Sequence, residues 1–181
     1  MGTLVSRVQG LCGRSHPRKA SIVIIGPHGS GKTTLLYRLK LNKAVETIPT
    51  PTYIVETLIF EDIILLVWDV SLGAMGGPLK KHFLEGRQGF LYVVDSTDSE
   101  TFSDARDELF YNINLDLPFI VLANKQDLDG ACSPSELVDH LKLDTLRARK
   151  WDVCGCSGIT GEGVHEALEK LCKMIAEAEK Q

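Results

Sequence analysis

The stretch SIVIIGPHGSGKTTLLYRLKL, residues 21–41, decides the fold of this protein. Residues 21–25 form a short, mostly β-branched apolar run that is typical of a buried strand, and residues 32–41 carry leucines at helical spacing. Between them, residues 26–33 match the pattern GxxxxGKT. A strand, a glycine-rich loop and a helix in this order predict a phosphate-binding loop.

The residue types of this loop fit phosphate chemistry. Its glycines allow successive backbone N–H groups to point at phosphate oxygens, the Lys32 ammonium reaches the β and γ oxygens, and the Thr33 hydroxyl can ligate Mg²⁺. A glycine turn with an incidental lysine is the alternative, and the flanking strand and helix disfavour it. The residues predicted to bind nucleotide here are Gly26, His28, Gly29, Ser30, Gly31, Lys32, Thr33 and Thr34.

The rest of the chain alternates between strand and helix patterns. Apolar runs predict strands at residues 53–60, 63–70, 89–95, 118–124 and 151–156. Only Glu61 and Asp62 separate the first two of these runs, which favours a hairpin with an antiparallel edge strand. We therefore predict an α/β fold with a doubly wound, six-stranded, mostly parallel sheet, whose ligands lie beyond the carboxyl ends of the strands.

Two helices have clear sequence signals. Ser133 is a typical cap, Pro134 suits the first helical position, and Glu136 lies three residues after the cap. The last helix carries one apolar stripe that can lie on the sheet, formed by Val164, Leu168, Leu171, Cys172 and Ile175.

Composition limits the function classes. The chain has 181 residues, 44% of them hydrophobic, and a formal net charge of −4, which suits one compact domain and gives no basic field for nucleic acid. The five cysteines form no CxxC pair and no secretory signal precedes them, so we expect a reducing, cytoplasmic environment. We also expect a monomer.

The sequence NKQD at residues 124–127 selects the base. It follows an apolar strand, so Asn124, Lys125 and Asp127 are expected at a carboxyl strand end, where the Asp127 carboxylate can accept hydrogen bonds from the N1 and N2 donors of guanine. After the last strand, the backbone N–H groups of Ser157 and Gly158 are suitably placed for the guanine O6. A surface loop of common polar residues is the alternative.

With these motifs the chain resembles the Arf and Arf-like branch of the Ras superfamily of small GTPases over nearly its whole length. The resemblance is carried by the phosphate loop, by IPT at 48–50, VET at 55–57, WDV at 68–70, VVDSTD at 93–98, ANKQD at 123–127 and TGEG at 160–163.

The resemblance implies exchange of GTP and GDP with Mg²⁺ in a P-loop G domain. It implies Thr33 and Thr50 as Mg²⁺ ligands and Asp69 as a partner of the ion through water. It also implies effector and exchange or activating proteins as partners, with effector contacts at Tyr53, Trp68 and Phe83. Partial core packing in a hairpin is the alternative for these aromatic residues.

The first residues predict reversible membrane association. MGTLVS matches the N-myristoylation pattern at Gly2, and apolar residues of the following segment fall on one helical face before a local basic cluster. We expect residues 1–19 to form an amphipathic, myristoylated segment and residues 20–181 to form the guanine-nucleotide-binding domain. The expected location is cytoplasmic with reversible attachment to intracellular membranes, Golgi or endosomal. A disordered tail is the alternative.

The sequence departs from the family pattern after WDV. The family has Gly, Gly and Gln here, whereas this chain has Ser71, Leu72 and Gly73. Gly73 therefore stands where the family glutamine orients the attacking water, so no catalytic residue is assigned and we expect weak or absent intrinsic hydrolysis. His28 replaces an acidic loop residue and either crowds the γ-phosphate or faces solvent.

Two functions remain open at this stage. The first is a membrane-associated, Arf-like regulator of vesicle traffic that hydrolyses GTP slowly. The second is an interaction module that holds guanine nucleotide without hydrolysing it. A small-molecule kinase is disfavoured, because NKQD at residues 124–127 specifies guanine.

Overall fold

The computed structural model describes residues 17–47, 53–71, 82–112, 117–146 and 150–180. Along the chain these ranges contain β1 (Arg18–Ile25), α1 (Lys32–Leu41), β2 (Tyr53–Phe60), β3 (Ile63–Val70), β4 (Gly89–Asp95), η2 (Ser99–Thr101), α3 (Phe102–Asn112), β5 (Phe119–Asn124), α4 (Pro134–Leu141), η3 (Leu143–Thr145), β6 (Trp151–Gly155) and α5 (Val164–Ala178).

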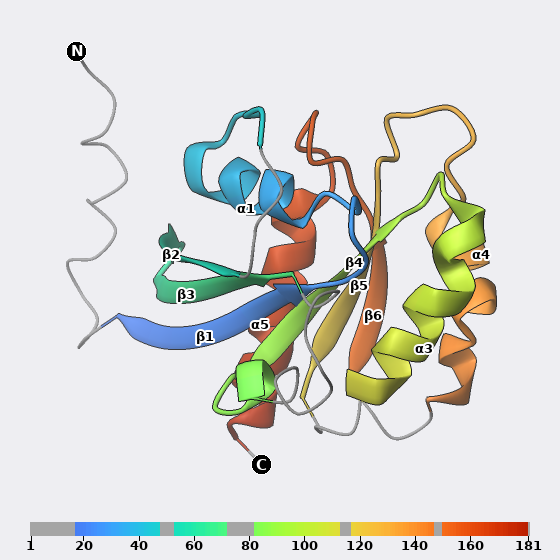
Figure 1. Cartoon of the computed structure of the whole chain (residues 1–181). Helices are drawn as coiled ribbons and strands as arrows, with labels where there is room; N and C mark the ends of the chain where they lie inside the picture. Colours follow the sequence, from blue (N-terminus) through green and yellow to red (C-terminus); the bar gives the residue numbers. More distant parts are fainter. Residues whose placement is uncertain (1–16, 48–52, 72–81, 113–116, 147–149, 181) are drawn as a thin grey trace.

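One six-stranded sheet organises the molecule, in the order β2-β3-β1-β4-β5-β6 (Figure 1). β2 pairs antiparallel with β3, and every other neighbouring pair is parallel. The β2–β3 hairpin turns at Glu61, which has a left-handed backbone with φ of 51°. The predicted fold class is confirmed, including the antiparallel strand at the edge.

Helices cover the sheet on both faces, and the alternation within β1 shows why. Ile22 and Ile24 point into a core shared with α1 and α5, whereas Val23 and Ile25 point into a core shared with α3 and α4. All four side chains are fully buried. A parallel strand covered on both faces must be apolar throughout, which explains the continuous apolar run that begins this fold.

The helices that the sequence predicted form with the expected chemistry. At α4 the Ser133 hydroxyl accepts from the Glu136 N–H, and the Glu136 carboxylate accepts from the Ser133 N–H at 2.7 Å, a complete capping box. The apolar stripe predicted for α5 is buried against the sheet.

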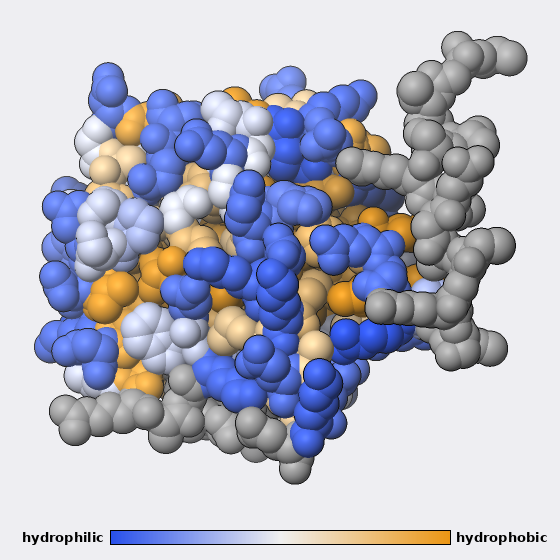
Figure 2. Space-filling model, turned by 180° about the vertical axis from the view of Figure 1, so that it is seen from behind, coloured by the Kyte–Doolittle hydropathy of each residue, from blue (hydrophilic) through white to orange (hydrophobic). Residues whose placement is uncertain are grey.

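The surface is mixed, with hydrophilic side chains separating small apolar patches on the face seen from behind (Figure 2). Large exposed apolar residues include Tyr53 and Ile59 on β2 and Ile159 after β6. Within the described ranges, no helix has the length and apolar character needed to cross a membrane.

The capping box gives a stability prediction. Ser133→Ala removes the acceptor for the Glu136 N–H and should lower the free energy of unfolding by about 1 kcal/mol. Ser103→Ala is the matched control, because Ser103 is an exposed residue of α3. Urea unfolding of both variants measures the difference, and equal losses would contradict a stabilising cap.

Candidate functional site

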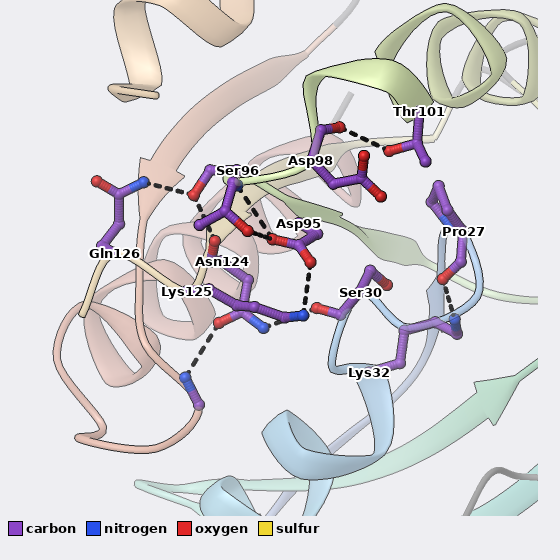
Figure 3. A network of polar contacts seen from close by, with 12 residues as sticks. Pro27, Ser30, Lys32, Asp95, Ser96, Asp98, Thr101, Asn124, Lys125 and Gln126 are labelled. Carbon is purple, nitrogen blue, oxygen red and sulfur yellow. Dashed lines mark hydrogen bonds and ion pairs between the residues drawn. The ribbon is translucent and has the colours of Figure 1, made fainter. Parts of the chain in front are cut away.

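The candidate site lies where parallel strands end on one edge of the sheet. The phosphate loop follows β1, Asp69 lies near the end of β3, Asp95 ends β4, Asn124 ends β5, and Ser157 follows β6. Figure 3 shows how the polar groups from several of these ends converge. The sheet topology therefore brings together residues that are far apart in sequence.

Two glycines of the phosphate loop are required by their positions. Gly26 has φ of 140°, and a Cβ there would lie 2.1 Å from the Val93 carbonyl oxygen of β4. Gly31 has φ of 93°, and a Cβ there would lie 2.4 Å from Asn124 Nδ2. No other residue type fits either place, so the loop passes close to the ends of β4 and β5.

Lys32 is folded back onto its own loop. Its ammonium donates to the carbonyl oxygens of Gly26 at 2.9 Å and Pro27 at 2.7 Å, and its side chain is buried. Burial lowers the pKa of Lys32, while the negative charges of Asp69 and Glu108 act in the opposite direction. The two carbonyl contacts thus hold the Lys32 amine at the start of the loop.

Thr33 and Asp69 are brought together as the resemblance implies. The Thr33 hydroxyl donates to Asp69 Oδ2 at 2.6 Å, and Asp69 is fully buried at the end of β3. A hydroxyl and a carboxylate are hard oxygen donors, which suits Mg²⁺ rather than zinc or copper. Within the described ranges, no group of three or more His, Cys, Asp and Glu residues could hold a metal ion.

Asn124 joins the phosphate loop to the loop after β6. Its Nδ2 donates to the Ser30 carbonyl oxygen at 2.8 Å, and its Oδ1 accepts from the Gly158 N–H at 3.0 Å. The Asn124 side chain is 2% exposed. Because a buried amide without its partners is costly, this bridge fixes the two loops relative to each other.

Lys125 forms an ion pair that sequence reasoning missed. Its Nζ lies 2.5 Å from Asp95 Oδ2, while Asp95 Oδ1 accepts from the Thr97 N–H and hydroxyl. Burial raises the pKa of Asp95, but the hydrogen bonds from Lys125 and Thr97 outweigh it and hold this pKa below its ordinary value of 3.8. The sequence signal that could have identified Asp95 is its place as a polar residue at the end of a buried strand.

Gln126 forms hydrogen bonds at the same edge of the sheet. Its Nε2 donates to Ser96 Oγ at 2.9 Å and to the Cys132 carbonyl oxygen at 2.9 Å. The Ser96 hydroxyl in turn donates to the Asn124 carbonyl oxygen. The three residues 124–126 are therefore tied to the β4 end and to the start of α4, while Asp127 itself is exposed.

In the loop after β6, the two N–H groups that the sequence predicts for guanine O6 have partners within the protein. The Ser157 N–H donates to the Glu162 carbonyl oxygen at 3.0 Å, and the Gly158 N–H donates to Asn124. Both N–H groups are thus engaged within the protein, because the loop closes on itself and on Asn124. A base at this place would share or exchange the Gly158 N–H, whereas the Ser157 N–H is turned to the inner side of the loop.

The remaining predicted site residues divide into two groups. His28 and Gly29 are exposed, and Thr34 Oγ1 lies 3.3 Å from Thr47 Oγ1. Gly2, Thr50, Leu72 and Gly73 lie outside the described residues.

The three predicted effector residues form one aromatic cluster. The ring centroid of Tyr53 lies 5.6 Å from that of Trp68 and 5.5 Å from that of Phe83. The Arg87 guanidinium, which the sequence did not single out, stacks on the Trp68 ring at 4.4 Å from its centroid. Tyr53 is 49% exposed, whereas Trp68 and Phe83 are half-buried and pack against the core on the α3 and α4 side of the sheet.

A six-stranded sheet with a phosphate-binding loop and NKQD at its strand ends defines a small GTPase. The chain belongs to the ADP-ribosylation factor family, whose sequence profile matches residues 6–175. A similar solved structure is the small GTPase Arl6 (BBS3) from Trypanosoma brucei with the bound nucleotide analogue GppNp. It has a TM-score of 0.79 and 27% identity, covering 88% of this chain and 98% of that chain. The predicted family is confirmed.

The Lys125–Asp95 pair predicts a pH dependence. Because the folded pKa of Asp95 is depressed, its stabilisation is present above the ordinary value of 3.8 and is lost as pH falls through the folded pKa. Asp95→Asn should therefore cost about 1 kcal/mol at neutral pH. The difference in unfolding free energy between this variant and the wild type should vanish in acid. Urea unfolding at a series of pH values from 7 downward measures it. A gap independent of pH would contradict a charge-based pair.

Proposed function

We propose that this family member is a guanine-nucleotide-binding regulator of vesicle traffic that attaches reversibly to membranes and hydrolyses GTP weakly by itself. The observation that carries the nucleotide part is the Asn124 bridge, which holds the phosphate loop and the loop after β6 at one edge of the sheet. This arrangement presents a phosphate cradle and a base-side loop at fixed separation, which is what a nucleotide requires.

Lys32 is the residue that meets the phosphates in this proposal. It exchanges its hydrogen bonds to the carbonyl oxygens of Gly26 and Pro27 for bonds to the β and γ oxygens. Thr33 and Asp69, with Thr50, are the residues that would hold Mg²⁺. When bound, this ion would neutralise charge on the β and γ phosphates.

Base selection rests on two separate loops. In this proposal the exposed Asp127 carboxylate accepts from the guanine N1 and N2 donors, and O6 shares the Gly158 N–H that here donates to Asn124 Oδ1. Adenine lacks these donors and this acceptor, so both contacts discriminate against it. Lys125 lies between these contacts with a left-handed backbone, φ of 68°, and its ammonium pairs with Asp95.

Weak hydrolysis is expected from the residue types at positions 72 and 73. Gly73 has no group with which to orient water, and Leu72 lacks the backbone freedom of the family glycine. The alternative, a module that holds nucleotide without switching, rests on the same residues. The ratio of GTP to GDP affinity separates the two, because equal affinities cannot shift a conformational equilibrium.

The aromatic cluster supports an effector surface. Tyr53, Trp68 and Phe83 provide apolar area, and Arg87 adds a positive charge beside it. Trp68 Nε1 and Arg87 Nε are buried without hydrogen-bond acceptors among the described residues. These two atoms lie out of reach of a docked partner, so the chemistry that fits the surface is an apolar side chain on Tyr53 beside an acidic group that meets the half-buried Arg87 guanidinium.

The hydrolysis proposal has a direct test. In single turnover, the wild-type protein should hydrolyse GTP more slowly than the about 10⁻⁴ per second of Ras-type proteins. Gly73→Gln restores an amide that can orient water and should raise the rate, whereas Gly73→Ala adds no such group and should not. Product quantification by chromatography measures all three proteins. Unaided wild-type hydrolysis at the Ras-type rate would refute the proposal.

Membrane attachment is tested at Gly2. In cells supplied with an alkyne analogue of myristate, the wild-type chain should be labelled and found partly with membranes. Gly2→Ala removes the glycine that the myristoylation pattern requires. The variant should carry no label, and most of it should leave the membrane fraction. Cys12→Ser is the control that leaves the myristoylation pattern intact. A labelled Gly2→Ala chain, or membrane binding that ignores this change, would count against the proposal.

A further inference from the structure

Arg38 of α1 reaches across to the loop that follows β6. Its Nε donates to the Gly158 carbonyl oxygen at 3.0 Å, and its Nη2 donates to the Ile159 carbonyl oxygen. We infer that Arg38 is a positioning residue for the base pocket, which aims the Gly158 N–H and thereby sets selectivity at the O6 position of guanine. The inference rests on the proposed binding of guanine nucleotide.

The loop is shaped to receive this arginine. Gly161 has φ of 90°, and a Cβ there would lie 3.3 Å from Arg38 Cδ and 3.4 Å from Arg38 Nε. Glycine at this position therefore leaves room for the arginine side chain to lie against the loop backbone. The planar guanidinium then presents its donors to consecutive carbonyl groups, which one lysine ammonium cannot do with the same geometry.

Few other contacts hold the outer side of the loop after β6. Ser157 Oγ accepts from the N–H groups of Ile159 and Thr160, which shapes the turn from within. The Ile159 side chain is 57% exposed and so does not anchor the loop by packing. The carbonyl groups of Gly158 and Ile159 are thus held from outside by Arg38.

Arg38 and Asn124 act on the same residue from opposite sides. Arg38 holds the carbonyl of Gly158, and Asn124 Oδ1 holds its N–H at 3.0 Å while Asn124 Nδ2 holds the Ser30 carbonyl. Gly158 is therefore held by α1 through its carbonyl group and by Asn124 through its N–H, so movement of either partner changes where this N–H points. Asp127, which reads the N2 amino group, lies on a different loop, so the two selectivities are separable.

The test measures nucleotide dissociation and two affinity ratios. IDP lacks the 2-amino group, and 6-thioguanosine diphosphate has a weak sulfur acceptor in place of O6. Arg38→Ala should speed GDP dissociation about tenfold, since charge-assisted hydrogen bonds are lost. It should lower the preference for GDP over 6-thioguanosine diphosphate and leave the preference for GDP over IDP unchanged. Arg38→Lys should give values between those of wild type and Arg38→Ala, because lysine keeps the positive charge but lacks the planar set of N–H donors.

Matched controls make the outcomes decisive. Lys40→Ala removes an ion pair with Glu56 from the same helix and should match wild type in both ratios. If Arg38→Ala does not fold, Arg38→Lys carries the same readouts. If Arg38→Ala leaves both affinity ratios unchanged, or lowers both together, the role of Arg38 is overturned and the proposed function is not. A wild-type protein that prefers ADP to GDP overturns the proposed function, and this inference with it.

Discussion

The buried amide of Asn124 is the interaction on which the rest of the site depends. It lies at the end of a central strand, 2% exposed, and satisfies the Ser30 carbonyl on one side and the Gly158 N–H on the other. Each of these groups would be costly to leave unpaired away from water. The phosphate loop and the base-side loop are consequently parts of one rigid unit, although 94 residues separate Asn124 from Ser30.

A second layer of contacts keeps this unit in place. Asp95 holds Lys125, and Arg38 holds the loop after β6 from outside. The aromatic cluster of Tyr53, Trp68 and Phe83 belongs to a different part of the sheet, on the β2–β3 hairpin and the segment before β4. The domain therefore separates the candidate nucleotide site at the strand ends from an aromatic cluster at the sheet edge.

Much of the fold could be predicted because its causes are local. The apolar runs, the two-residue break at Glu61 and the cap at Ser133 each act within a few residues, and all three appear as expected. Arg38 and Asp95 could not be assigned in this way. The Arg38 contact joins residues 120 apart, and the contact of Asp95 with Lys125 joins residues 30 apart, so no spacing rule connects them.

The sequence by itself determined the glycine-rich loop, the NKQD motif at the end of a buried strand and the order of strands and helices, because residue type and short spacing set backbone freedom and burial. Only the tertiary structure decided which partner each polar group takes. The Gly158 N–H illustrates this, since the sequence placed it after a strand but not against Asn124. Its direction depends on how α1 and the phosphate loop close around it, which is a property of the packed fold.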